Sequence, residues 1–160
     1  MANTYDFTVS TEGGMNAPWD RHENLYIMKK TIDFGDEDIF TAALASDDTY
    51  QLFDIPAGTW VLACWMNVTE AEATNTTATL AIGDTSSTAG YLTATTVATA
   101  GTYGGLYGGS EAYRALSGRM YGSAQTDADG AAERVISAIA GTAALSNAVI
   151  DFYCVCIKMT

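Results

Sequence analysis

Hydrophobic and polar residues alternate along much of this chain, with the two-residue period of a β-strand. In the segment 25–34, Tyr26, Met28, Ile32 and Phe34 share one face, which Lys30 interrupts. Similar patterns predict further strands at residues 39–44, 49–55, 59–68, 77–82, 91–98, 113–120, 134–140 and 148–158. Strands at this spacing predict an all-β fold, an antiparallel β-sandwich with a jelly-roll-like topology.

Two of the expected strands are apolar on both faces. In the segment 59–68, one set of alternating residues is Trp60, Leu62, Cys64, Met66 and Val68, and the other is Val61, Ala63, Trp65 and Asn67. The segment 148–158 has the same character, so we expect the two strands to be neighbours. A strand of this kind either lies centrally in the sandwich with both faces covered, or offers one face to another subunit.

The N-terminal segment 1–24 differs in character from the rest of the chain. It contains Gly13-Gly14 and the turn-rich segment 16–20, which are typical of loops. We therefore expect an extended N-terminal arm at residues 1–24 and a single β-sandwich domain at residues 25–160. The first residues also lack the basic start and apolar stretch of a secretory signal, which favours a protein made in a cytoplasm.

The net charge and the absence of a long apolar run argue against two classes of partner, nucleic acids and membranes. The 160 residues carry 7 basic and 19 acidic side chains, a formal net charge of −12. Such a surface repels phosphate backbones, so no nucleic-acid binding is expected. No uncharged apolar run of about 20 residues is present to span a bilayer, so no membrane association is expected either.

Few residues in the chain suit catalysis or metal binding. His22 is the single histidine and lies in the N-terminal arm, where a solvated loop position is expected. Cys64, Cys154 and Cys156 fit neither a disulfide framework nor the usual spacing of a zinc site, so reduced core residues are expected. The segment 126–130 lacks the ligands of an EF-hand. The acidic turns 36–38 and 47–48 are expected to be solvated, with the alternative that they bind a hard cation if the fold or a neighbouring subunit brings them together. We expect no enzyme activity, no cofactor and no metal.

The aromatic residues fit a contact surface better. The glycine-rich segment 103–113 lacks the Gly-Lys-Ser/Thr sequence of a phosphate-binding loop but carries several tyrosines. Tyrosine and tryptophan are enriched in protein interfaces. The candidate interaction residues are Trp19, Trp60, Trp65, Tyr103, Tyr107 and Tyr113.

Three segments resemble a known family. They are the run Tyr50-Gln51-Leu52-Phe53-Asp54-Ile55-Pro56-Ala57-Gly58-Thr59-Trp60-Val61-Leu62, the fragment Ile82-Gly83-Asp84, and the closing strand at residues 144–153. Over roughly residues 49–157, the chain resembles small structural proteins of tailed-bacteriophage virions.

The resemblance implies a β-sandwich or jelly-roll module that coats a capsid as a decoration or cement protein, often as a trimer. It implies a location in the virion, assembled in the host cytoplasm, and contact with the major capsid protein or another virion protein. It brings no catalytic residues. The alternative is a carbohydrate- or receptor-binding module of a head fibre or tail tip, with Trp19, Tyr103 and Tyr107 as a stacking platform.

Overall fold

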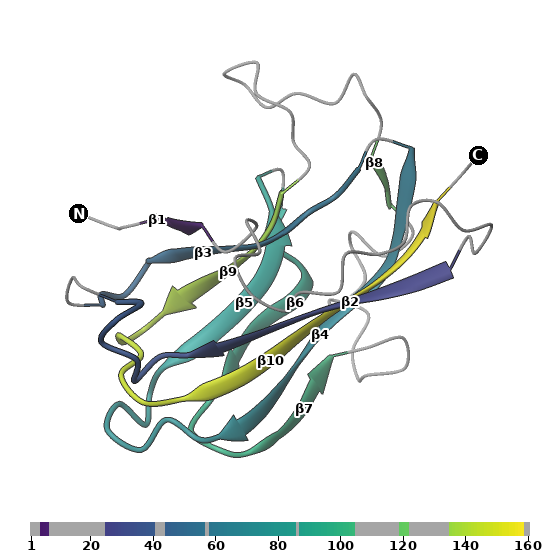
Figure 1. The fold of residues 1–160 in the computed structure, drawn as a ribbon. Helices are drawn as coiled ribbons and strands as arrows, with labels where there is room; N and C mark the ends of the chain where they lie inside the picture. The colour runs from purple at the N-terminus through teal and green to yellow at the C-terminus, as the bar shows by residue number, and fades with distance from the viewer. Residues whose placement is uncertain are drawn as a thin grey trace.

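Two β-sheets pack face to face in the computed structural model, which describes residues 4–6, 25–40, 44–56, 58–85, 87–104, 119–121 and 135–158 (Figure 1). The described residues contain no helix, and so none that is long and apolar enough to cross a lipid bilayer. The strands are β1 (Thr4–Asp6), β2 (Leu25–Asp33), β3 (Thr49–Asp54), β4 (Thr59–Glu70), β5 (Thr79–Asp84), β6 (Ser87–Thr96), β7 (Gly101–Gly104), β8 (Arg119–Tyr121), β9 (Val135–Gly141) and β10 (Val149–Lys158). The predicted all-β sandwich is confirmed.

The strands are ordered β1-β3-β9-β5-β6 in one sheet and β2-β10-β4-β7 in the other, where β8 also pairs with β4. All neighbours are antiparallel except β1, whose three residues run parallel to Thr49–Gln51 of β3. The prediction that β4 and β10 are neighbours is confirmed, because Trp65 pairs with Tyr153 and Cys64 with Cys154. The other residues of the predicted arm, 1–3 and 7–24, lie outside the described residues.

The core lies between the sheets and is built from the inward face of each strand. At one end, the Phe34 ring stacks on Phe40 with centroids 5.5 Å apart and meets Tyr50 edge-on at 5.0 Å. Burying aromatic and aliphatic side chains is the main favourable term in folding a domain of this size. The largest side chains with almost no exposure are Tyr50, Tyr91, Phe152, Ile32, Leu52, Ile55, Met66, Leu80, Ile82, Leu92 and Ile136.

A β-bulge in β4 overturns part of the predicted face pattern. Val155 pairs with Ala63, but the next residue, Cys156, pairs with Val61, so Leu62 is an extra residue in β4. The extra residue reverses the alternation, and Val61 is therefore buried on the same side as Cys64. Trp60, predicted to share a face with Cys64, instead lies on the opposite face.

The strand predicted at residues 39–44 is wrong in its described part. Ile39 and Phe40 belong to a turn in which both backbone amides donate to the Asp36 carbonyl, at 3.2 and 3.0 Å. The Asp36 side chain accepts the Asp38 amide at 2.9 Å, a local bond that favours a turn over a strand. Of the strand predicted at 113–120, only Arg119 and Met120 are described, and they belong to β8.

The buried carboxylate of Glu72 fixes two loops at the end of the sandwich where Phe34 and Phe40 pack. Glu72 is only 1% exposed and lies in the loop from β4 to β5. Its oxygens accept the amides of Thr74 and Asn75, both at 3.0 Å, within its own loop. They also accept the amides of Ser146 (2.6 Å) and Asn147 (3.1 Å) from the loop between β9 and β10. Glu72 therefore joins two loops that are distant in the sequence.

Candidate interaction surface

The sheet β2-β10-β4-β7 turns one face to the core and the other outward, and we call the latter the outer face. Pairing across the strands arranges its residues in rows perpendicular to the strand direction. Four of the rows are Thr31-Asp151-Asn67-Thr102, Lys29-Tyr153-Trp65-Gly104, Ile27-Val155-Ala63 and Leu25-Ile157-Trp60. Beyond the Thr31 row, Val149 pairs with two exposed acidic residues, Asp33 and Glu70. The first row is polar, the second is aromatic, and the last two are apolar.

The apolar half of the outer face is exposed around its margin, whereas its paired residues Val155 and Ala63 are buried, at 8% and 2% exposure. Leu25 is 56% exposed, Ile27 51% and Trp60 38%, and they are three of the four large hydrophobic side chains that are exposed among the described residues. Contiguous exposed apolar side chains on a sheet face are typical of an interaction site. This half of the face is the strongest candidate for a contact surface.

The polar row of the outer face has its negative charge neutralised. Lys29 Nζ lies 2.8 Å from Asp151 Oδ2, and Thr31 Oγ1 donates to Asp151 Oδ1 at 2.5 Å. Partial burial raises the pKa of Asp151, but the hydrogen bonds from Lys29 and Thr31 outweigh that effect and lower it overall. Asp151 is thus charged and paired, so it presents little repulsion to an approaching acidic surface.

The aromatic row is internally stacked. The rings of Trp65 and Tyr153 face each other with centroids 5.1 Å apart and planes 9° from parallel. Lys29 Nζ lies 5.6 Å from the Tyr153 centroid. Because the two rings cover each other, they do not form a flat aromatic platform of the kind that sugars stack on.

The predicted interaction residues separate into three groups. Trp60 and Trp65 both lie on the outer face, since the bulge at Leu62 brings them to the same side. Tyr103 packs against the core, and its hydroxyl donates to the Thr99 carbonyl at 2.9 Å, so it is not displayed as an exposed ring. The remaining candidates, with the single histidine, lie outside the described residues: Trp19, Tyr107, Tyr113 and His22.

Sequence reasoning missed Leu25 and Ile27 as members of the contact surface. The signal was present, because both are apolar and alternate with Tyr26 and Met28, which places them on the opposite face of the segment 25–34.

The three cysteines are free thiols buried in the core. The Sγ atoms of Cys154 and Cys156 lie 3.4 Å apart. Burial raises the pKa of Cys64 and of Cys154, which keeps both thiols protonated. Within the described ranges, no group of three or more His, Cys, Asp or Glu side chains has a geometry that could hold a metal ion.

Comparisons with known proteins place the fold. No protein-family model matches the sequence, and no curated protein is significantly similar to it. A chain of the cyanophage Pam1 capsid asymmetric unit has the same fold, with a TM-score of 0.56 and 18% sequence identity over 96% of this chain and 99% of that chain. A chain of the acidic stable capsid of Helicobacter pylori bacteriophage KHP30 is less similar, with a TM-score of 0.49 and 16% sequence identity over 88% of this chain and 92% of that chain. This protein therefore shares its fold with a chain found in a bacteriophage capsid.

Proposed function

We propose that this protein is a non-enzymatic structural component of a bacteriophage virion, which binds the outer capsid surface and associates with copies of itself. The observation that carries the proposal is the exposed margin of the apolar half of the outer face, formed by Leu25, Ile27 and Trp60. The shared fold with a chain of the Pam1 capsid asymmetric unit supports a place in the particle. A decoration or cement role fits both the exposed apolar residues of the outer face and the fold shared with a capsid chain.

The strand order supports a jelly-roll architecture for this role. Without the short β1 and β8, the sheets are β3-β9-β5-β6 and β2-β10-β4-β7, so all neighbouring strands except the β5–β6 hairpin come from distant parts of the chain. Two four-stranded sheets with such crossovers are typical of jelly rolls, which are common in virus capsids.

Charge explains which face of the protein can meet another copy. The net charge of −12 would repel a second copy over most of the surface. The polar end of the outer sheet still carries the exposed acidic residues Asp33 and Glu70, although Lys29 neutralises Asp151. The apolar half has no described acidic side chain among its paired residues. Self-association is therefore favoured at the outer face, with a trimer as the expected state.

The first test is the oligomeric state in solution. At tens of micromolar, sedimentation velocity should show an oligomer for the natural protein and a monomer for the double variant Leu25→Ser, Ile27→Ser. The matched control is Ile39→Ser, because Ile39 is 44% exposed but lies in the turn after β2, away from the outer face. Since all three positions are exposed, the free energy of unfolding should change by less than about 1 kcal/mol.

The second test is binding to empty capsids of the same virus, measured by co-sedimentation. The natural protein should pellet with the capsids in a saturable way. A natural protein that stays monomeric at tens of micromolar and remains in the supernatant with empty capsids contradicts the proposed function.

A further inference from the structure

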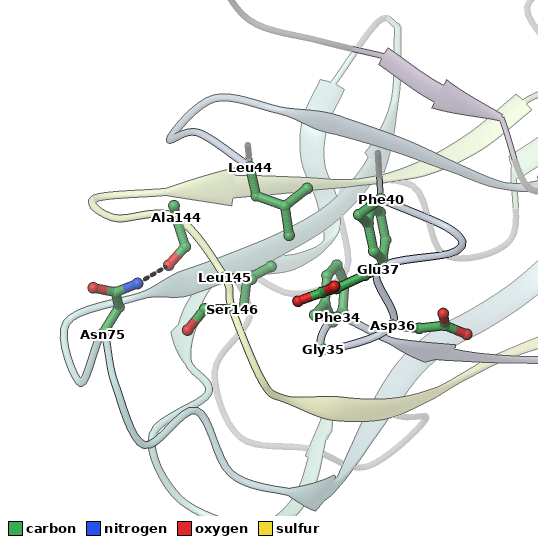
Figure 2. A pocket seen from close by; sticks show the side chains of 10 residues that line it. All are labelled: Phe34, Gly35, Asp36, Glu37, Phe40, Leu44, Asn75, Ala144, Leu145 and Ser146. Atoms are coloured by element: carbon green, nitrogen blue, oxygen red, sulfur yellow. Dashed lines mark hydrogen bonds between the residues drawn. The ribbon is translucent and has the colours of Figure 1, made fainter. Parts of the chain in front are cut away.

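A pocket of about 350 Å³ opens at the end of the sandwich, between the turn after β2, the β4–β5 loop and the β9–β10 loop (Figure 2). Its apolar wall is formed by Phe34, Phe40, Leu44 and Leu145. The Phe34 and Phe40 rings are stacked and almost fully buried, so this wall is a fixed part of the core. The volume is at the lower end of the range for small-molecule sites and suits one long side chain.

One carboxylate is directed into the pocket. Figure 2 shows the Glu37 side chain extending toward Leu145 and Ser146, while the Asp36 side chain points in the opposite direction. Asp36 accepts the amide of Asp38 and so belongs to the turn. Glu37 is exposed and has no hydrogen-bond or ion-pair partner within the described part of the chain. None of the lining residues is basic, so the charge of Glu37 is not compensated within the lining.

The wall opposite the turn is held rigidly. Asn75 Nδ2 donates to the Ala144 carbonyl at 2.9 Å and links the two loops of this wall. Ser146 Oγ donates to Glu72 Oε1 at 2.8 Å behind the wall. The opening is therefore maintained by hydrogen bonds that do not involve Glu37.

We propose that this pocket receives an arginine side chain of a protein partner. The aliphatic stem of arginine would pack on Leu44, the half-buried member of the apolar wall, and the guanidinium would pair with Glu37. A guanidinium is planar and weakly hydrated, so it suits an apolar pocket with one inward-directed carboxylate better than an ammonium group does. The partner class, a virion protein, rests on the proposed function, whereas the arginine site rests on the pocket.

The direct test is a titration of the full chain with N-acetyl-arginine amide, followed by amide chemical shifts. The expected shift changes centre on Gly35, Asn75 and Leu145. The citrulline analogue has nearly the same shape but no charge, and should bind about tenfold more weakly. Glu37→Gln should weaken the arginine compound by about tenfold, whereas the control Asp38→Asn, which removes the same charge one residue away and outside the pocket, should change its affinity less than twofold.

Three results would overturn the inference: equal binding of the arginine and citrulline compounds, unchanged affinity in Glu37→Gln, or shift changes confined to other parts of the chain. The capsid assay separates this outcome from failure of the proposed function. If the arginine compound binds as expected but the natural protein does not bind capsids, the site stands and the virion role fails. If the natural protein and Glu37→Gln bind capsids equally and the arginine compound causes no shift changes at the pocket, the arginine site is wrong and the virion role stands.

Discussion

Trp65 of β4 stacks on Tyr153 of β10, and the next strand along places Gly104 beside the other side of Trp65. A Cβ atom at Gly104 would lie 3.3 Å from both the Trp65 Cβ atom and the Cys64 carbonyl oxygen, so a larger residue there would crowd β4. The stack joins β4 to β10, and Trp65 lies at the position where β4 also pairs with β7.

Replacing this tryptophan should therefore cost stability. We expect Trp65→Ala to lower the free energy of unfolding by about 2 kcal/mol, because a half-buried indole and an aromatic stack are both lost. Trp65→Phe should recover roughly half of that loss. Urea unfolding followed by circular dichroism measures both variants. If Trp65→Ala is no more destabilising than an ordinary surface substitution, about 0.5 kcal/mol or less, the stack does not support the sheet.

The Glu72 carboxylate should give the protein an acid-sensitive stability. Burial raises the pKa of Glu72, but the hydrogen bonds donated by the amides of Ser146, Asn75 and Asn147 outweigh it and lower the pKa from 4.5 to about 2. A group whose pKa is lowered on folding stabilises the protein fully above its unfolded pKa, and this contribution is lost as pH falls through the folded pKa.

The free energy of unfolding should therefore fall as pH is lowered from about 4.5 toward 2. Glu72→Gln should reduce that dependence and lower stability at pH 7 by about 2 kcal/mol, because the charge-assisted hydrogen bonds are weakened. Chemical unfolding at a series of pH values measures both effects. An unchanged pH profile in Glu72→Gln would assign the acid sensitivity to other carboxylates.

Gly83 should not tolerate a side chain. A Cβ atom there would lie 2.0 Å from the Ser87 carbonyl oxygen, which is backbone of the facing strand. We expect Gly83→Ala to lower the melting temperature by several degrees, since the β5–β6 hairpin has to shift. The control is Gly35→Ala, whose nearest neighbour is the end of the Asp33 side chain at 3.3 Å. Similar melting temperatures for the two variants would contradict the clash.

The core thiols should not react with thiol reagents in the folded protein. Burial raises the pKa of Cys64 and Cys154, and the contact with Cys154 together with burial raises the pKa of Cys156. Thiolate is the reactive form, so we expect negligible reaction with Ellman's reagent at pH 8 and release of three equivalents in concentrated urea. Fast reaction of even one equivalent in native buffer would show that this core opens readily.

Much of the fold followed from the two-residue period, because burial of one strand face leaves a strong signal in sequence. The faces of β10 and its pairing with β4 were predicted in this way and are confirmed. The bulge at Leu62 was not predictable, since an extra residue adds no distinctive sequence pattern and its effect appears only when a partner strand fixes the register.

The end of the sandwich was harder to predict for a different reason. Glu72 is a lone acidic residue in a polar segment, and such residues are normally solvated. Its burial depends on the amides of Ser146 and Asn147, which belong to a loop far away in the sequence, and no local pattern encodes that approach. The pocket beside Glu37 was missed likewise, because it is formed by three loops that meet only in the folded chain.

Backbone amides from both loops behind the pocket donate to the single carboxylate of Glu72, so this wall of the pocket is already formed before a ligand binds. A visiting side chain then loses its own rotational freedom on binding but does not have to order the receptor. The affinity of the pocket should therefore depend on how well the bound side chain fits it, and not on a rearrangement of the surrounding loops.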